Sequence, residues 1–253
     1  MKQSTERFSD RVEDYVRYRP DYPPEIVDRL IELCDLNDKS AIADIGSGTG
    51  IFSNRLLTRG LRVAAVEPNK EMREAAEAQL SQYAKFSSID GSAESTHLND
   101  LSVNLIVAAQ AFHWFRLPET RREFKRILKP NGSIALIWNQ RELQSPFQKD
   151  YDEMLRQHAP EYNDTNHLNL SDQTITQLFD TGSNKVLNFE NAQIFDLSGF
   201  LGRMQSSSYT PAKGLPGHDN LVSLATELFN QYEENGCIRF DYKTRLYLGR
   251  LNH

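Results

Sequence analysis

The chain has 253 residues, which is enough for one enlarged α/β domain or for one domain with a small appendage. Its 35 aspartates and glutamates outnumber its 29 lysines and arginines, so the formal net charge is −6. An acidic chain without a basic cluster repels phosphate backbones, and we expect no nucleic-acid partner.

The cysteines, histidines and apolar runs indicate the expected cellular compartment and the absence of a metal site. The two cysteines, Cys34 and Cys237, lie far apart in apolar neighbourhoods, which is typical of buried thiols in a reducing compartment. The N-terminus has no apolar stretch and the longest apolar runs are too short to span a bilayer, so we expect a cytoplasmic protein with no membrane partner. The six histidines show no metal-ligand spacing, and we expect no metal site.

The first predicted element is an amphipathic helical arm. Residues 4–19 place aromatic and apolar side chains at helical spacing, and the proline-rich segment 20–24 ends the pattern. A second helix should begin after Pro24 and end near Cys34. We therefore treat residues 1–40 as an N-terminal helical arm and lid.

The middle of the chain alternates between short apolar strands and helical patterns. The alternation predicts strands at residues 41–45, 61–66, 86–89, 103–108 and 133–138. It predicts helices at residues 51–59, 69–82 and 118–128, followed by a turn at 129–132. This order is typical of a parallel sheet with helices on both faces, whose ligands lie beyond the C-terminal ends of the strands.

The alternation lapses after Asn139. The later pattern predicts two helices within residues 146–181, a strand at 186–195, helices at 197–206 and 219–233, and a strand at 242–248. We therefore expect an α/β fold with a Rossmann-like, seven-stranded, mostly parallel sheet and helices on both faces. The last strand should be antiparallel, and a helical insertion should follow the fifth strand. The whole chain should form one structural domain.

A glycine-rich turn follows the first predicted strand. The stretch Asp44-Ile45-Gly46-Ser47-Gly48-Thr49-Gly50 places three glycines at alternating positions after an apolar run. Glycines there let the backbone turn sharply and approach a ligand closely, and the next helix would aim its free N–H groups into the same space. The alternative is an ordinary glycine-rich turn in an α/β core.

The ends of the next strands carry residues suited to a nucleoside. Glu67 ends the second strand, 17 positions after Gly50, close to the distance of about 20 at which a carboxylate meets a ribose in dinucleotide folds. Asp90 follows the third strand and Gln110 follows the fourth. A dinucleotide fits poorly, however, because its fingerprint needs Gly or Ala where this chain has Ile51.

These motifs resemble those of the class I methyltransferases that depend on S-adenosylmethionine. The resemblance spans residues 41–138 and is carried by Asp44 to Gly50, Glu67-Pro68-Asn69 with Met72, Asp90 to Glu94, and Arg126 to Gly132. A weaker resemblance, to small-molecule methyltransferases near the trans-aconitate type, is carried by residues 18–23, 112–115 and 208–211.

The resemblance implies a methyltransferase that uses S-adenosyl-L-methionine and releases S-adenosyl-L-homocysteine. Residues 41–140 would form its cofactor-binding core, and residues 141–253 would supply the acceptor-pocket insertion and complete the sheet. The implied cofactor-binding residues are Tyr18, Arg19, Asp44, Gly46, Ser47, Gly48, Glu67, Asn69, Met72, Asp90, Ser92, Ala93 and Gln110. Arg19 would pair with the cofactor carboxylate, and the alternative for it is an exposed arginine near a turn.

Methyl transfer is an in-line displacement, so the protein mainly positions two reactants and excludes water. Phe112, Trp114, Phe115 and Tyr209 are candidate aromatic walls for a cation, and Tyr209 is also a candidate catalytic residue. His113 is the candidate general base, with a packing role in the pocket wall as the alternative. A carboxylate acceptor would need no base, and Arg141 or Arg116 could hold it.

We expect a small-molecule methyl acceptor, bound mostly by residues 142–235, in a monomer or homodimer. The length and aromatic content of that region favour a closed site. An NAD-dependent oxidoreductase is the first alternative, and Ile51 counts against it. A catalytically silent binding protein that keeps the cofactor fold is the second, although an intact Asp44, glycine turn and Glu67 would be unusual there.

Overall fold

The computed structural model describes residues 17–159, 161–163, 175, 178–179 and 184–251. The greater part of the predicted arm, residues 4–16, lies outside the described residues. So does most of the second helix predicted within residues 146–181. Among the described residues, none of the helices combines the length and the apolar character that crossing a membrane requires.

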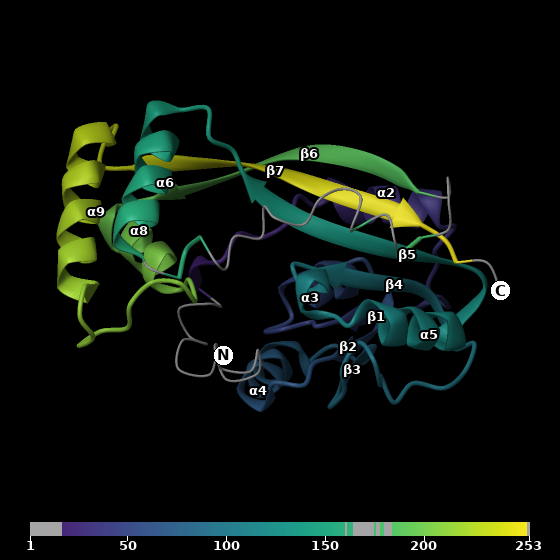
Figure 1. Cartoon of the computed structure of the whole chain (residues 1–253). Helices are drawn as coiled ribbons and strands as arrows, with labels where there is room; N and C mark the ends of the chain where they lie inside the picture. Colours follow the sequence, from purple (N-terminus) through teal and green to yellow (C-terminus); the bar gives the residue numbers. More distant parts are fainter. Residues whose placement is uncertain (1–16, 160, 164–174, 176–177, 180–183, 252–253) are drawn as a thin grey trace.

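A seven-stranded sheet forms the centre of the molecule, in the order β3-β2-β1-β4-β5-β7-β6 (Figure 1). The strands are β1 (Ala41–Ile45), β2 (Arg62–Val66), β3 (Phe86–Ile89), β4 (Val103–Ala109), β5 (Leu128–Arg141), β6 (Lys185–Phe195) and β7 (Ile238–Gly249). β1 to β5 are parallel, and β7 pairs antiparallel with both β5 and β6. The predicted fold class is confirmed.

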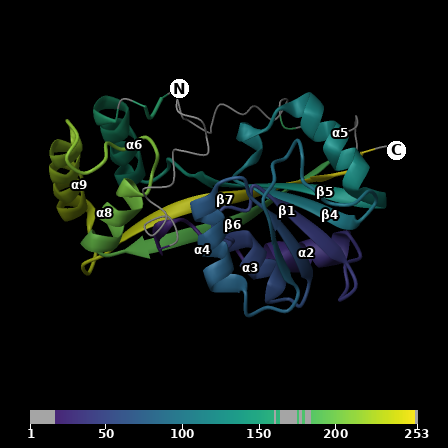
Figure 2. The same cartoon turned by 90° about the horizontal axis from the view of Figure 1, so that it is seen from below.

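Helices cover both faces of the parallel part (Figure 2). α2 (Glu25–Leu33), α3 (Ile51–Leu57) and α4 (Lys70–Leu80) pack on one face, and α5 (Leu117–Ile127) packs on the other. Strand β4 shows why two layers form, because its apolar side chains alternate: Leu105 and Val107 join the first layer, and Ile106 and Ala108 join the second.

Strands β5, β7 and β6, which are neighbours at one side of the sheet, extend beyond the other strands. A helical group lies at their far end (Figure 1). This group contains α6 (Pro146–His158), α8 (Leu197–Gln205) and α9 (His218–Tyr232). Its apolar side chains form a separate core with the start of β7, centred on Tyr151, Phe200 and Phe240. We call this helical group, together with the ends of β5, β6 and β7 on which it packs, the C-terminal extension. It forms a second, aromatic-rich core beside the parallel sheet.

The largest differences from the predicted boundaries are at the starts of β5 and β7. Residues 129–132, predicted as a turn, belong to β5, which absorbs them through a register shift opposite residues 103–105 of β4. Strand β7 begins at Ile238 instead of 242, because its first residues pair with the end of β6. Both strands are longer than their apolar cores suggest, since sheet pairing continues into polar residues.

Candidate active site

A cavity of about 520 Å³ lies at the junction between the parallel sheet and the helical group. Its lining comes from the ends of β1, β2 and β4, from the 92–94 loop, and from β5, β7 and α8. The volume falls within the roughly 300–1,000 Å³ of typical ligand pockets. The cavity therefore has a core end, built by the parallel strands, and a C-terminal end, built by the extension.

The core end lies at the point where the strand order reverses. β1 has β2 on one side and β4 on the other, which opens a crevice beyond their C-terminal ends. Gly46 takes φ +66° there, and a Cβ on it would lie 2.6 Å from the Cβ of Ala111, just after β4. Only glycine lets the two loops approach this closely, which explains the first glycine of the turn.

Asp44, the penultimate residue of β1, has a buried carboxylate. Its Oδ2 accepts a hydrogen bond from Ser53 Oγ of α3 at 2.7 Å, whereas its Oδ1 is buried on the cavity wall with no hydrogen-bond partner among the described residues. Burial raises the pKa of Asp44 to about 7, against the effect of the Ser53 hydrogen bond. Asp44 thus offers an acceptor oxygen to a donor in the cavity.

Glu67 is held rigidly at the end of β2. Its two carboxylate oxygens accept hydrogen bonds of 2.9 Å from the backbone N–H groups of Gly48 and Asn69. The Asn69 side chain caps α4 by accepting from Met72 N at 2.9 Å. Burial raises the pKa of Glu67, although the two backbone hydrogen bonds oppose that shift. The carboxylate is therefore fixed with free lone pairs toward the cavity it lines.

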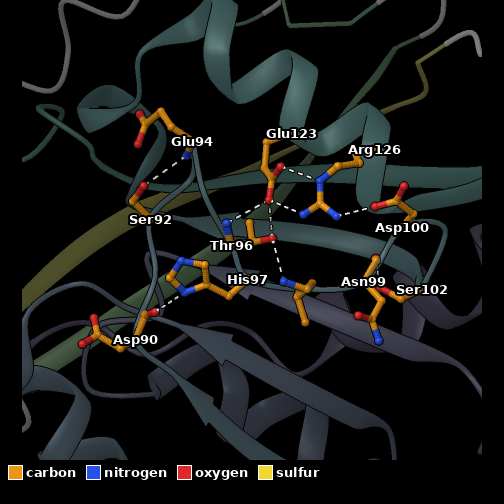
Figure 3. Close-up of polar contacts among 11 residues, drawn as sticks. Asp90, Ser92, Glu94, Thr96, His97, Asn99, Asp100, Ser102, Glu123 and Arg126 are labelled. Atoms are coloured by element: carbon orange, nitrogen blue, oxygen red, sulfur yellow. Dashed lines mark hydrogen bonds and ion pairs between the residues drawn. The ribbon is translucent and has the colours of Figure 1, made fainter.

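The loop after β3 brings Ser92 and Ala93 to the cavity. Figure 3 shows how it is held: Glu123 of α5 accepts hydrogen bonds from Thr96 N at 2.8 Å and Thr96 Oγ1 at 2.6 Å, and also pairs with Arg126. Burial would raise the pKa of Glu123, but the bonds from Arg126 and Thr96 outweigh it and lower the pKa to about 2. Sequence reasoning missed this anchoring carboxylate.

Besides the alternative clamp Arg116, three predicted site residues do not line the cavity. Asp90 has a side chain that is 73% exposed and pairs with Arg73, so its carboxylate is directed to that arginine. Phe112 is a core residue that packs edge-on against Phe115 and Trp138. Tyr18 instead packs its ring so tightly on Gly202 that a Cβ there would overlap the ring. Side-chain direction, which spacing does not reveal, separates these residues from the site.

The other predicted residues do meet at the cavity. Its lining includes Arg19, Asp44, Gly46, Ser47, Gly48, Glu67, Asn69, Met72, Ser92, Ala93, Gln110, His113, Trp114, Arg141 and Tyr209. Gln110 takes φ +58°, an uncommon conformation for a residue other than glycine, directly after β4. The ring centroids of His113 and Trp114 lie 4.7 Å apart. Their functional roles stay predictions.

The N-terminal segment is tied across the cavity by polar contacts. Arg19 donates to the carbonyl oxygen of Ser206 after α8 at 3.1 Å. The Asn139 side-chain amide of β5 donates to the carbonyl of Asp21 at 3.2 Å. Tyr22 packs edge-on against Phe52 of α3. Arg19 thus lines the cavity beside the loop after α8, while the segment that follows it contacts β5 and α3.

At the C-terminal end of the cavity, the buried Arg141 has a carboxylate partner. The Arg141 guanidinium donates to Asp152 Oδ1 of α6 at 2.9 Å and to the hydroxyl of Tyr162 at 2.5 Å. The side chain of Asp152 is only 7% exposed, and it also pairs with Arg156 at 2.7 Å. Arg116, the other predicted clamp, does not line the cavity. Arg141 is therefore paired inside the protein with a buried carboxylate, which it shares with Arg156.

A second buried arginine, Arg203 of α8, was missed by sequence reasoning. Its Nη1 donates to Ser207 Oγ at 3.0 Å, and the Tyr242 hydroxyl is a further hydrogen-bond partner. Burial would raise the pKa of Tyr209, but the charges of Arg203 and Arg141 outweigh it and lower that pKa below its ordinary value. The available signal was one arginine in the apolar helix pattern of residues 197–205.

Further lining residues escaped prediction because they come from segments with no motif, mainly β5 and β7. They are chiefly Trp138, Asn139, Tyr162, Tyr242, Arg245 and Tyr247. Within the described parts of the chain, no group of three or more His, Cys, Asp or Glu side chains is arranged to hold a metal ion.

The sequence similarity of this chain to known proteins includes the part that forms the parallel sheet. Residues 43–136 match the family described as "Methyltransferase domain". The chain is 36% identical over 152 residues to an uncharacterized methyltransferase of Schizosaccharomyces pombe, covering 58% of this chain and 58% of that protein. It is 38% identical over 135 residues to an uncharacterized methyltransferase of Mycobacterium bovis, covering 53% of each. The chain thus spans little more than half the length of these curated relatives.

A solved structure extends the likeness to the whole fold. A proposed type II methyltransferase from Anaeromyxobacter dehalogenans superposes with a TM-score of 0.72 at 22% identity, covering 93% of this chain and 100% of that one. At this identity the likeness shows the fold alone. The chain is thus similar in sequence to methyltransferases over its parallel-sheet part, and the solved structure shows a likeness of fold over nearly the whole chain.

Proposed function

We propose that this protein transfers a methyl group from S-adenosylmethionine to a small-molecule acceptor. The observation that carries the proposal is one cavity lined both by the Gly46–Gly48 turn with Glu67 and by the arginines and tyrosines of the C-terminal extension. A transferase needs such a shared space, because both reactants must meet in line with water excluded. The motifs at the strand ends and the likeness to methyltransferases support the same conclusion.

The residues at the core end fit the cofactor. The two fixed oxygens of Glu67 would accept from the ribose hydroxyls, and the orphan Oδ1 of Asp44 would accept from a donor on the methionine moiety. Ser92 and Ala93 would border the adenine, and Arg19 would pair with the methionine carboxylate. The bound cofactor supplies an electrophilic methyl group on a sulfonium.

The opposite wall would orient the acceptor. Trp114 and Tyr209 line the cavity and present aromatic rings, which suit a site where positive charge is lost. We assign acceptor recognition to residues 141–253, and we expect the same fold to act as a monomer or homodimer in the cytoplasm. The cavity volume of about 520 Å³ favours a metabolite over a macromolecule.

His113 is proposed as a general base at this wall. Loss of a general base lowers rates by about 100-fold or more, so His113→Ala should reduce turnover and remove a pH dependence near neutrality. An unchanged turnover rate between about pH 6 and pH 8, the range in which histidine titrates, would leave His113 with a packing role only.

Two measurements test the proposed function. S-adenosylhomocysteine should raise the Tm of the full chain, and a labelled methyl group should move from S-adenosylmethionine into a compound of a metabolite extract. Glu67→Gln should weaken the thermal shift, and Glu77→Gln, on the exposed side of α4, should not. Stabilisation by NAD and not by S-adenosylhomocysteine would favour the oxidoreductase. Binding without methyl transfer would favour the silent binding protein.

A further inference from the structure

Arg203 places a buried positive charge in the cavity wall. The residue is 8% exposed, and its Nε atom is buried with no hydrogen-bond partner among the described residues. Its hydrogen-bond partners are the neutral hydroxyls of Ser207 and Tyr242. Within the described parts of the chain, no carboxylate forms an ion pair with it. The Nε atom of Arg141 is likewise buried without a hydrogen-bond partner among the described residues, so Arg203 differs from Arg141 in lacking a carboxylate partner.

Arg141 shows what a structural arginine looks like at this site. It pairs with Asp152 of α6, and the pair is closed by Tyr162. Arg203 and Arg141, and to a smaller extent Arg19, come close enough to Tyr209 to lower its pKa against the effect of burial. Of Arg203 and Arg141, only Arg141 has a carboxylate partner among the described residues, namely Asp152, which also pairs with Arg156.

An unbalanced buried charge is expensive for a fold that gains nothing from it. Transfer of a guanidinium from water destabilises the folded state unless an opposite charge accompanies it, and apolar residues of similar length often replace buried ions without loss. Because Arg203 lines the cavity, a ligand can supply the missing negative charge. The unpaired Nε and the planar guanidinium suit two carboxylate oxygens.

We propose that the methyl acceptor carries a carboxylate group that binds Arg203. This inference rests on the proposed function and names the chemical class of its second substrate. The rings of Tyr162, Tyr209 and Trp138 line the same space, so the carboxylate is attached to an apolar or aromatic body. The proposal concerns recognition of the acceptor and leaves open which of its atoms receives the methyl group.

The surroundings of Arg203 assign this anion to the acceptor and not to the cofactor. Its contacts are Ser207, Tyr209 and Tyr242, all from the loop after α8 and from β7. The glycine turn and Glu67 belong to the opposite end of the cavity, beyond the parallel strands. Arg19 also lines the cavity and bonds Ser206, but it comes from the N-terminal segment, whose Tyr22 packs on Phe52 of α3.

The test uses the full chain saturated with S-adenosylhomocysteine. Butanoate, hexanoate and phenylacetate are titrated beside their primary amides, and Tm is recorded. Each amide keeps the shape of its acid and removes the charge. We expect at least one acid to stabilise the protein with an affinity roughly 10- to 100-fold above that of its amide, as a charge-assisted bond to a buried guanidinium predicts.

Three variants locate the effect. Arg203→Met removes the charge at similar length, and Arg203→Lys keeps it without the planar fork. Arg239→Met is the matched control, because Arg239 is an exposed arginine of β7 that pairs with Asp241. Arg203→Met should lose the preference for the acid, Arg203→Lys should keep part of it, and Arg239→Met should keep all of it. Without ligand, the Tm of Arg203→Met should equal or exceed that of the wild type.

The possible outcomes separate the two proposals. If S-adenosylhomocysteine fails to stabilise the wild type, the proposed function itself is wrong. If the cofactor product binds but no acid is preferred over its amide, or if the preference survives in Arg203→Met, the carboxylate site is wrong. A loss of S-adenosylhomocysteine binding in Arg203→Met would assign the guanidinium to the cofactor instead. If Arg203→Met fails to fold, its predicted stability is contradicted and Arg203→Lys decides the location.

Discussion

The two ends of the cavity are built from different materials. At the core end the backbone provides most of the contacts. Gly46, in a left-handed backbone conformation, lets two loops approach each other, and backbone N–H groups fix both oxygens of Glu67. At the C-terminal end long side chains provide them, with Arg141 and Arg203 set among tyrosines. The first arrangement suits an invariant cofactor, and the second can change with the acceptor.

The largest expected effect is at the core end. Gly46→Ala should weaken S-adenosylhomocysteine binding by about 100-fold or more, because the new Cβ would lie 2.6 Å from the Cβ of Ala111 and displace the turn. Gly60→Ala is the control: Gly60 has φ +75°, and a Cβ added there would meet no other described residue within 4 Å beyond its chain neighbours. Equal losses in calorimetric titrations of both variants would show that close approach to Ala111 is not what matters.

At the C-terminal end, Tyr209→Phe should weaken use of the acceptor without changing affinity for the cofactor product. The change keeps the ring that packs 4.9 Å from Tyr162 and removes the hydroxyl whose pKa the arginines lower. We expect kcat/KM for the acceptor to fall by roughly 10- to 30-fold and the affinity for S-adenosylhomocysteine to stay unchanged. A variant that lost cofactor affinity instead would break the division between the two ends.

This division also explains what could be predicted from the sequence. The glycine turn and Glu67 follow short apolar strands at fixed spacing, so local pattern was enough to place them together at a sheet edge. Parallel pairing of β1 with β2 and β4 then confirmed the arrangement of strands on which that reasoning depended.

The rest depended on long-range pairing and side-chain direction. Arg203 and Tyr242 meet only because α8 packs on the extension that β6 and β7 form, and no spacing in the sequence encodes that meeting. Asp90 follows its strand as predicted, yet Arg73 pairs with its carboxylate. Phe112 lies in an aromatic motif but points into the core. Motifs therefore located the loops better than the individual side chains.

A smaller effect is expected from pH at the core end. Because burial raises the pKa of Asp44 to about 7, this carboxyl is largely protonated in slightly acidic solution. A donor such as the cofactor ammonium binds the ionised form, so affinity for S-adenosylhomocysteine should rise as the pH rises through 7, by up to about tenfold per unit below the pKa. Asp44→Asn should bind more weakly and lose this slope. A slope that persists in the variant would assign it to another group.

The raised pKa of Asp44 has the opposite effect on the stability of the folded protein. Between the ordinary pKa of 3.8 and about 7, the folded state holds more protons on Asp44 than the unfolded state does. Stability of the ligand-free protein contributed by this group therefore falls as pH rises through that window. Asp44→Asn should flatten the fall, as measured by Tm across the window.

The smallest effect should come from the loop anchor. Glu123→Gln removes the charge that holds Thr96 and Arg126, so the loop bearing Ser92 and Ala93 should loosen and weaken S-adenosylhomocysteine binding by about threefold. The depressed pKa of Glu123, about 2, means that its stabilising effect is present above the ordinary value of 4.5 and is lost as pH falls through about 2. Glu119→Gln, in the first turn of the same helix, is the control.

The division of the cavity into a cofactor end and an acceptor end is tested most directly by calorimetric titration of S-adenosylhomocysteine into wild type, Gly46→Ala and Arg203→Met. We predict that Gly46→Ala loses most of the affinity and that Arg203→Met keeps it within about twofold, since changes at distant, independent sites do not affect each other. Equal losses in Gly46→Ala and Arg203→Met would contradict this division.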